Sequence, residues 1–433
     1  MEIQPGADGN SDCARLECFA ERVSSKMRDE NRPAAPGVLK GVRVLDLSDV
    51  VAGPVATLYL AMLGAEIIKV ENPRRGGDVN RRTAPVENGC SLRFCTLNHN
   101  KKSIAVDLAT AEGKALVLRL AACSDIVVEN FRHGVMERLG LGFEELKKAN
   151  PKIVYGSISG FGSTGPYCDR PAYDVIAQAM SGVAMMNGDE GGPPVKVGTS
   201  IGDVMAGMNL AIGVLAALRE AERTGEAQRV EVALVDAMIS ALLMDHVKYL
   251  YNGELPVRTG NRYREWSPYG LYPAKDGYYA LGVGSQLFYE VLVRDVLGCP
   301  ELLEDERCAS HNTRICYREL TEDRLNAWAA QRTVKEVCAA LDAVGIPNAP
   351  VNSVREVAKD PHFAEARNMF PRYEQPEIGT VQVTNLPLRF PERGEVELTA
   401  APAFGQQTEA VLEELLGMSG EQIGALKDAG VLF

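Results

Sequence analysis

The chain has 433 residues, of which 46% are hydrophobic and 24% are charged, and its formal net charge is -12 at pH 7. This composition is typical of a globular protein long enough for two or three domains, and it argues against general disorder. The acidic balance disfavours a general nucleic-acid-binding protein, which usually carries a basic surface. No run approaches the roughly 18 consecutive apolar residues of a membrane helix, so we expect a soluble protein without a membrane partner.

The cysteines and histidines give no sign of a metal site. The ten cysteines form no C-x-x-C pair, and the five histidines stand apart from one another. This pattern disfavours a zinc module and favours reduced thiols in an intracellular protein, so we expect no metal.

The N-terminal segment differs in composition from the rest of the chain. Residues 1–38 hold Pro, Gly, Asn and acidic residues with little periodicity, which predicts a partly disordered extension. Its acidic residues argue against a transit peptide, and it contains no apolar signal-peptide core. We therefore expect a cytoplasmic protein.

Beyond this extension, short apolar strands alternate with helices, which is typical of parallel α/β units. The strands are expected at 42–47, 66–70, 103–106, 126–129, 153–158 and 229–232. The helices are expected at 56–63, 111–122, 143–149, 203–222 and 236–250. The order predicts an α/β fold with a Rossmann-like, doubly wound sheet, whose ligands bind at the carboxyl ends of the strands.

The second half of the chain predicts a smaller domain inserted into this large one. A segment rich in Gly, Pro, Arg and aromatic residues spans 252–272, and a smaller α+β unit begins at Gly277. After Pro350 the pattern returns to that of the large domain and ends in two helices. We expect a Rossmann-like large domain in residues 39–250 and 351–433, with a linker and small domain in residues 251–350.

Two nucleotide-binding motifs are absent from the sequence. No G-x-G-x-x-G follows the first strand, and no G-x-x-x-x-G-K-[ST] occurs. Hydride transfer and phosphoryl transfer therefore lose their main support in the sequence.

An ordered set of short blocks resembles one enzyme family. The blocks include VAGP at 51–54, LGAEIIKVE at 63–71, NKKSI at 100–104, VENFR at 128–132, SGFG at 159–162 and GD at 202–203. Together they are similar to the CaiB/BaiF family, the class III or formyl-CoA transferase-like CoA-transferases, from about residue 40 to the C-terminus. The resemblance implies an interlocked homodimer that uses coenzyme A (CoA) as a substrate and needs no prosthetic group.

The same resemblance places the family nucleophile at Asp203. A carboxylate there would attack the thioester of an acyl-CoA and form a mixed anhydride, then an aspartyl-CoA thioester, before a free carboxylic acid accepts the CoA. The start of a helix suits an ionised carboxylate, because the helix dipole and unpaired N–H groups stabilise it. The alternative is a plain N-cap aspartate.

A second pair of residues comes from the segment that follows Arg170-Pro171. Tyr173 and Asp174 are expected to begin a helix that carries Gln178. The resemblance implies that Tyr173 contacts CoA and that Asp174 assists the chemistry. The alternative is a helix cap with a packed aromatic side chain.

Further CoA contacts follow from the resemblance, at the loops after the first and fourth strands and at one arginine beyond them. The implied residues are Val51, Ala52, Asn130, Phe131, Arg132 and Arg138. Arginines suit the phosphate charges of CoA in an otherwise acidic protein.

The chain departs from the family at two positions that are often basic in relatives, Asn72 and Ala109. The missing charge could be replaced by one of four residues: Arg74, Arg75, Lys101 or Lys102. Relatives also carry a glycine run that covers the intermediate, and the candidates here are Gly260-Asn261 and the loop 282–286.

Two other functions remain as alternatives. Acyl-CoA racemases or epimerases of the same superfamily need two bases and have a histidine where this chain has Tyr173. An ordinary tyrosine, with a pKa near 10, is a poor base at neutral pH, so we favour the transferase. A non-catalytic CoA-binding protein is disfavoured because Asp203 and Asp174 are both present. The residues do not select the acids exchanged. We expect a small dicarboxylate such as succinate as one partner, and the apolar surroundings of the site would equally suit a larger acid.

Overall fold

A computed structural model describes residues 37–433, so the expected extension of residues 1–38 lies almost wholly outside the described residues. The chain divides into two compact units. Unit 1 comprises the described part of Met1–Ser181 together with Val197–Leu243 and Asn368–Phe433, and unit 2 comprises Gly182–Lys196 and Met244–Arg367. The boundaries expected at 250/251 and 350/351 both fall inside unit 2, which also includes the short segment before Val197.

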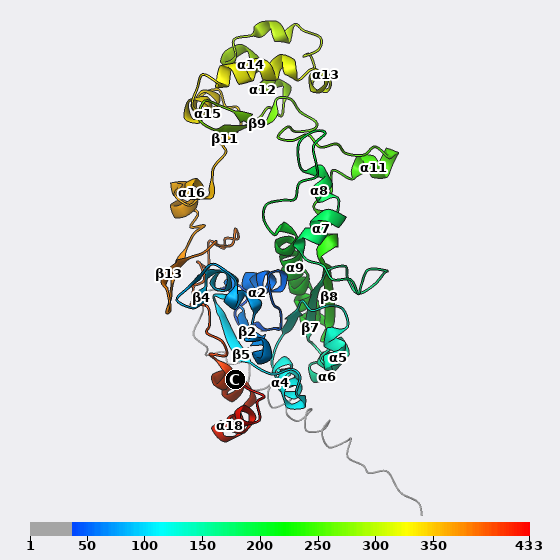
Figure 1. The fold of residues 1–433 in the computed structure, drawn as a ribbon, viewed down its shortest axis with the longest axis vertical. Coiled ribbons are helices and arrows are strands. Elements are labelled where there is room, and N and C mark those ends of the chain that lie inside the picture. The colour runs from blue at the N-terminus through cyan, green and yellow to red at the C-terminus, as the bar shows by residue number, and fades with distance from the viewer. Residues whose placement is uncertain (1–36) are drawn as a thin grey trace, which may run out of the picture. The chain divides into compact units, whose positions relative to one another are not determined.

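The core of unit 1 is a six-stranded sheet in which all neighbouring strands are parallel (Figure 1). Its strand order is β5-β2-β1-β6-β7-β8. The strands are β1 (Arg43–Asp46), β2 (Glu66–Glu71), β5 (Lys101–Ala105), β6 (Ile126–Glu129), β7 (Val154–Ser159) and β8 (Gln228–Ala233). The predicted parallel α/β fold is confirmed, and the strand order, running outward in both directions from β1, is that of Rossmann folds.

Helices cover both faces of this sheet. One face packs against α4 (Ala111–Ala122), α6 (Phe143–Ala149), α17 (Thr408–Leu416) and α18 (Gly420–Asp428). The other packs against α2 (Ala52–Met62), α9 (Ile201–Thr224) and α10 (Leu234–Ser240). Side chains of a strand alternate between the faces: Tyr155 of β7 belongs to the first core, whereas a Cβ on the next residue, Gly156, would lie 2.7 Å from Val214 of α9.

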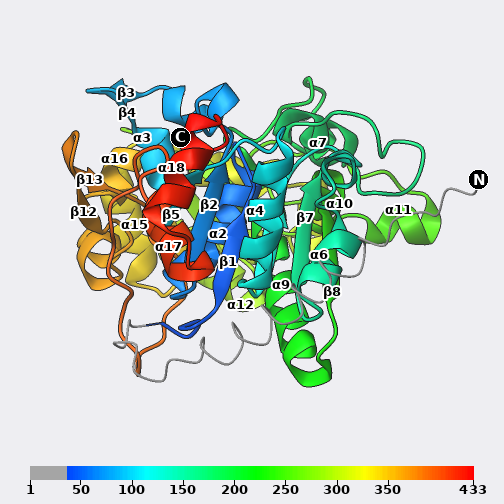
Figure 2. The ribbon, with the colours of Figure 1, turned by 90° about the horizontal axis from the view of Figure 1, so that it is seen from below.

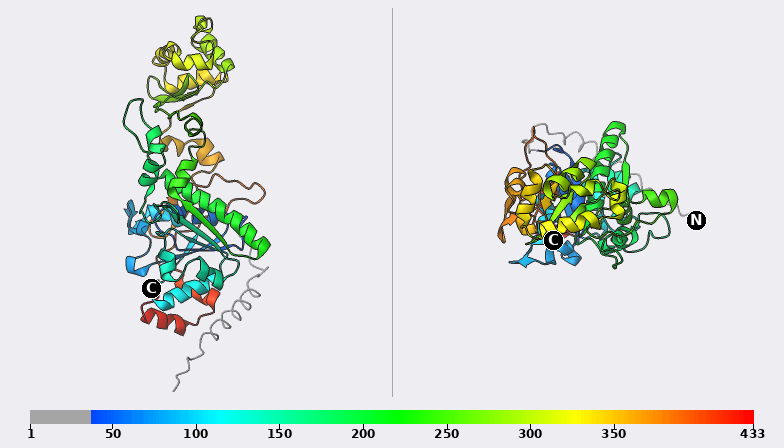
Figure 3. Two further views of the ribbon diagram at one scale, coloured as in Figure 1. Left: turned by 90° about the vertical axis from the view of Figure 1, so that its right-hand side faces the viewer. Right: turned by 90° about the horizontal axis from the view of Figure 1, so that it is seen from above.

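The C-terminal segment returns to unit 1. In Figures 2 and 3 the red C-terminal helices lie near the cyan helix α4, and α17 contacts α4 although the two helices are far apart in the chain. The hairpin β12 (Arg372–Gln375) and β13 (Gly379–Gln382) shares a small core with α3 (Leu92–Asn98). From Asn368 onward the chain therefore belongs to unit 1.

The helix α9 is long and apolar enough to cross a membrane by length and composition alone. In the structure it is a core helix, because it packs against β7, β8 and α2. A Cβ on Gly207 would lie 2.6 Å from the carbonyl oxygen of Ala52, so only glycine allows α9 to approach the start of α2 this closely.

One predicted helix is wrong. The apolar run 236–250 forms two short helices, α10 and α11 (Val247–Asn252), separated by turns at 241–246. The chain passes from unit 1 to unit 2 between Leu243 and Met244, inside these turns. No glycine or proline marks the break, so the sequence pattern carried no signal of it.

Unit 2 has its own three-stranded antiparallel sheet and its own core. The sheet consists of β9 (Tyr269–Pro273), β10 (Tyr278–Gly282) and β11 (Asn348–Pro350). Its longer helices are α14 (Glu319–Ala329) and α15 (Val334–Asp342), and the shorter α12 (Gln286–Val291) follows β10. Both glycine segments expected near the intermediate, Gly260-Asn261 and 282–286, belong to this unit, and their covering role stays a prediction.

The remaining elements are short. In unit 1 they are β3 (Val86–Glu87), β4 (Cys90–Ser91), α5 (Val135–Leu139) and α7 (Asp174–Met180). In unit 2 they are α8 (Val183–Met186), α13 (His311–Cys316) and α16 (Val354–Val357). Single turns of 3-10 or π-helix include Pro73–Arg75, Val79–Arg82, Leu292–Val296, Pro300–Leu303 and His362–Ala366.

Candidate active site

A cavity of about 700 Å³ in unit 1 crosses the carboxyl ends of five strands. Its walls come from the residues that end or follow the strands: Leu108 and Ala109 after β5, Glu71 and Asn72 at β2, 48–52 after β1, 130–132 after β6, and Ser159 and Gly160 at β7. Tyr173, Asp203 and Leu234 also line it. The cavity therefore lies where the sequence pattern placed the ligand site, and its volume is that of a small-molecule site.

Asp203 is the third residue of α9 and lines the cavity. The N-cap of α9 is Ser200, whose side chain makes no cap bond. Instead, the backbone N–H of Gly202 donates to Oδ1 of Asp174 at 2.7 Å. The alternative of a plain N-cap role for Asp203 is thus wrong, because a different aspartate caps the helix.

Asp174 is the first residue of α7, and Tyr173 is its N-cap residue, as the sequence predicted. The buried side chain of Gln178 donates from Nε2 to Oδ2 of Asp174 at 2.7 Å and accepts from the N–H of Val197 at 2.8 Å. Both carboxylate oxygens of Asp174 are thereby occupied by protein donors. Tyr173 is 71% exposed and lines the cavity, so it is not a packed core aromatic.

The carboxyl of Asp203 has a perturbed acidity. Burial, together with the negative charge of Asp174, raises its pKa to about 6, and the positive charge of Arg93 opposes this rise. The group is therefore still mainly ionised at neutral pH, and its carboxylate forms no hydrogen bond with any residue in 37–433 that would have to break before it reacted.

The loops after β1 and β6 are locked together by one side chain. Oδ1 of Asn130 accepts from the N–H of Asp49 at 2.8 Å, and Nδ2 of Asn130 donates to the carbonyl of Asp49 at 2.6 Å. The amide of Asn130 thus joins, through its oxygen and its nitrogen, two loops that both line the cavity. This arrangement makes Asn130 a residue that positions the cavity wall.

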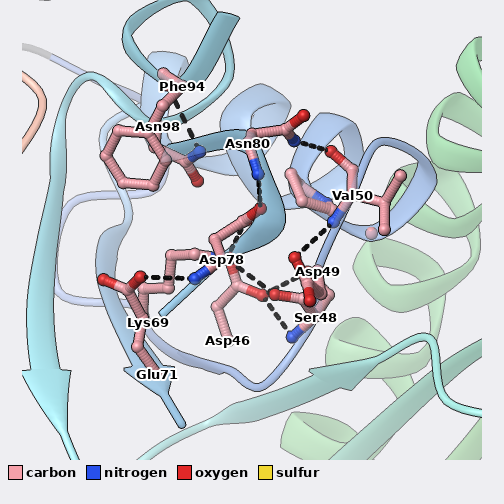
Figure 4. Close-up of polar contacts among 12 residues, drawn as sticks. Asp46, Ser48, Asp49, Val50, Lys69, Glu71, Asp78, Asn80, Phe94 and Asn98 are labelled. Atoms are coloured by element: carbon pink, nitrogen blue, oxygen red, sulfur yellow. Dashed lines mark hydrogen bonds and ion pairs between the residues drawn. The ribbon is translucent and has the colours of Figure 1, made fainter. Parts of the chain in front are cut away.

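The loop after β1 contains a strained residue at the cavity. Val50 has a φ of 69°, a left-handed conformation that is rare for a β-branched residue. Its N–H donates to Oδ1 of Asp49 at 2.8 Å, and its carbonyl accepts from Nδ2 of Asn80 (Figure 4). Such strain costs about 1–3 kcal/mol and persists only where the surroundings hold it.

A buried charge cluster supports this loop (Figure 4). Nζ of Lys69 lies 2.9 Å from Oδ2 of Asp78 and donates to the carbonyl of Ser48 at 2.6 Å. Although burial opposes it, the nearby Lys69 ammonium holds the pKa of Asp78 at about 2. Burial and the neighbouring Asp78 raise the pKa of Asp49 to about 7. Near neutral pH the two carboxyl groups therefore differ in charge, which limits repulsion beside the cavity.

The loop after β6 is held from its other side by Glu129. Its Oε2 accepts from the N–H of Phe131 at 2.7 Å, and its Oε1 accepts from the hydroxyl of Tyr155 at 2.8 Å. Burial raises the pKa of Glu129 to about 7. The peptide that precedes Arg132 is thus anchored to the sheet.

Most of the residues expected at the site come together. Those that line the cavity are Val51, Ala52, Asn130, Phe131, Arg132, Tyr173 and Asp203. Asp174 lies directly behind Asp203 at the start of α9, whereas Arg138 is exposed on α5 and is not among the lining residues.

The sequence analysis missed several lining residues, including Asp49, Lys69, Asp78, His133 and Arg170. Asp49 and His133 each lie within a few positions after the end of an expected strand. This position, at the carboxyl end of a parallel strand, is the signal by which they could have been predicted as lining residues. In residues 37–433, no group of three or more His, Cys, Asp or Glu side chains could hold a metal ion.

The fold and the site together define a class of protein. A parallel α/β unit carries an elongated cavity that has cationic side chains along it and an ionisable, half-buried carboxylate at one side. Such a site suits an enzyme that binds an anionic small molecule.

The comparison with known proteins agrees with this class. Residues 39–408 match the model of CoA-transferase family III, and the chain belongs to that family. It is therefore a CoA-transferase, whose substrates are CoA thioesters.

Named relatives and a solved structure cover nearly the whole chain. A succinyl-CoA–D-citramalate CoA-transferase of Chloroflexus aurantiacus is 35% identical over 403 residues, which are 93% of this chain and 99% of the relative. A succinyl-CoA:glutarate CoA-transferase of Mus musculus is 35% identical over 91% of this chain and 90% of its own. The crystal structure of a CaiB/BaiF family protein from Brucella suis superimposes with a TM-score of 0.78 at 34% identity, covering 88% of this chain and 100% of that one.

The charge of Asp174 should set the pH dependence of Asp203. In Asp174→Asn, Oδ1 can still accept from Gly202, but the negative charge that raises the pKa of Asp203 is gone. The measurement is the single-turnover rate at which the covalent acyl adduct expected on Asp203 forms, as a function of pH. This rate should be half-maximal near pH 6 in the wild type, and its midpoint should fall by up to about one pH unit in the variant.

The control for this pH profile is Asp236→Asn, which removes an exposed carboxylate from α10 and should leave the midpoint in place. A midpoint that stays or rises in Asp174→Asn would contradict the electrostatic coupling.

Proposed function

We propose that this CoA-transferase moves CoA from a dicarboxylic acyl-CoA to a free carboxylic acid through a covalent intermediate on Asp203. The observation that carries the proposal is the position of Asp203: its carboxyl lines the cavity at the start of α9, and its pKa of about 6 leaves it ionised at neutral pH. Asp203 also occupies the position that the family resemblance assigns to the nucleophile.

In the first half-reaction, an Oδ atom of Asp203 attacks the thioester carbonyl and CoA leaves as a thiolate, which gives a mixed anhydride. The thiolate then attacks the aspartyl carbonyl, the donor acid leaves as a carboxylate, and an aspartyl-CoA thioester remains. In the second half-reaction the acceptor carboxylate attacks this thioester, and the same two steps run in reverse. Every bond broken is replaced by one formed, so no redox partner is required.

Asp174 would act on this chemistry through position and charge. It holds the first turn of α9 by accepting from Gly202, so Asp203 keeps a fixed direction toward the cavity. Its two oxygens already accept hydrogen bonds from Gly202 and Gln178, so the carboxyl is engaged with the protein itself. We therefore assign Asp174 a positioning role.

The donor is proposed to be a dicarboxylic acyl-CoA such as succinyl-CoA. The relatives from Chloroflexus aurantiacus and Mus musculus are both named as succinyl-CoA transferases. Arg93, an exposed residue in the first turn of α3, acts electrostatically on Asp203 and forms no hydrogen bond or ion pair with any residue in 37–433. A free guanidinium near the nucleophile suits the remote carboxylate of such a donor.

A homodimer is part of the same proposal. The family resemblance implies an interlocked dimer. Large apolar side chains are also exposed in both units, including Ile212, Leu243, Leu250 and Tyr251. Apolar surface of this kind marks an interaction site. Light scattering should therefore give about twice the 46.9 kDa of one chain, and a monomer at micromolar concentration would contradict the dimer.

The intermediate can be trapped directly. After incubation with succinyl-CoA and hydroxylamine, peptide mass spectrometry should find a hydroxamate on Asp203. Asp203→Asn should give none, because an amide is not a nucleophile here, while Asp236→Asn should react as the wild type does. If no donor yields an adduct and solvent deuterium enters the α-carbon of the acyl group instead, the protein is a racemase or epimerase.

Donor preference tests the role of Arg93. Arg93→Gln should slow adduct formation with succinyl-CoA roughly 10- to 100-fold relative to butyryl-CoA, since one charge-assisted bond to a carboxylate is lost. Arg223→Gln removes the same charge at the far end of α9 and should leave the ratio unchanged. Equal losses with both donors would mean that Arg93 acts on Asp203 and not on the acyl group.

A further inference from the structure

The two positions at which this chain lacks a basic residue, Asn72 and Ala109, both line the cavity. Four nearby residues could supply the missing charge, and three of them are already engaged. Lys101 is buried in an ion pair with Asp46, at an Nζ–Oδ2 distance of 3.2 Å. Lys102 donates to Glu66 at 2.6 Å.

Of the adjacent arginines Arg74 and Arg75, only the first is paired with a carboxylate of the protein. Nε of Arg74 donates to Oδ2 of Asp107 at 2.7 Å, and this bond ties the turn after β2 to the segment after β5. Arg75 is exposed, lines the cavity, and forms no side-chain hydrogen bond or ion pair with any residue that the structure describes. Of the four candidates, Arg75 is therefore the one whose charge is available to a ligand.

The backbone around Arg75 holds it in place. It ends a single 3-10 turn, Pro73–Arg75, in which Oδ1 of Asn72 accepts from the N–H of Arg74 at 2.9 Å. The turn closes at Gly76, whose φ of 64° favours glycine. Asn72 thus serves as the cap of this turn, and the arginine three positions later presents the charge.

Arg75 and Asp203 reach the cavity from different elements. Arg75 follows β2, which neighbours the edge strand β5, whereas Asp203 lies on α9, whose first turn is bound to Asp174 of α7. Arg132, after β6, also lines the cavity.

A CoA molecule has its thiol at one end, its diphosphate in the middle and its 3′-phosphorylated adenosine at the other end. Since the thioester must reach Asp203, the 3′-phosphate lies at the far end of the cavity. We propose that Arg75 binds the 3′-phosphate of CoA and so replaces the basic residues that this chain lacks at 72 and 109; this assignment rests on the proposed reaction at Asp203.

The surrounding charges support this assignment. The two acidic side chains nearest in the cavity lining, Glu71 and Asp78, are neutralised by Arg81 and Lys69 respectively. The guanidinium of Arg75 is thus not consumed by a protein carboxylate, and its planar fork can hold a phosphate through two parallel hydrogen bonds.

The test compares two ligands that differ by a single phosphate. Calorimetric dissociation constants are measured for free CoA and for 3′-dephospho-CoA with the wild type, Arg75→Gln and Arg223→Gln. Arg75→Gln should weaken CoA roughly 10- to 100-fold and 3′-dephospho-CoA less than about twofold, because the lost bond exists only with the 3′-phosphate. Arg223→Gln, which removes an exposed arginine from the C-terminal end of α9, should bind both ligands as the wild type does.

Equal weakening of both ligands by Arg75→Gln would overturn the assignment, since the arginine would then bind the diphosphate or support the fold. Unchanged binding of CoA would also overturn it. Adduct formation on Asp203 does not depend on which phosphate Arg75 binds. A wild type that is trapped on Asp203, beside an Arg75→Gln variant with normal CoA affinity, would therefore refute this inference alone.

Discussion

Two buried ion pairs fix the strand ends from which the loops around the cavity start. Lys101 with Asp46 joins β5 to β1, and Lys69 with Asp78 joins β2 to the turn that follows it. Burial alone would raise the pKa of Asp46, but Lys101, Lys69 and hydroxyl donors lower it below its ordinary value. Removing one partner of such a pair leaves a buried charge that costs about 3–5 kcal/mol, so other strand and loop arrangements are strongly disfavoured.

The charged groups of unit 1 thus fall into two sets with different tasks. The buried set is neutralised internally and supports Val50, Asn130 and the cavity walls. The second set, which includes Asp203, Arg75 and Arg132, lines the cavity and remains available to ligand. In a protein with a net charge of -12, local cations at the cavity are what attract a polyanionic substrate.

Much of the fold was predictable because its signals are local. Strand 126–129 and helix 143–149 were predicted to the residue, since apolar periodicity and flanking polar residues mark both ends. The helix predicted at 236–250 failed because the chain changes unit between Leu243 and Met244, where no glycine or proline marks the break. For the site, short motifs placed Asp203, Tyr173 and the 130–132 loop at the cavity, but they gave no means of separating Arg75 from Arg74, which are adjacent and identical in type.

The sequence by itself determined the parallel α/β class, the family resemblance and the residues with reactive groups, because these depend on periodicity and on residue type at fixed spacing. Only the tertiary structure decided that Asp174 caps α9, that Asn130 is used to join two loops, and that Arg138 stays outside the cavity. Hydrogen bonds and ion pairs between residues far apart in the chain select which polar groups are consumed and which are left for substrate. That selection is a property of distances between side chains, which no local sequence pattern contains.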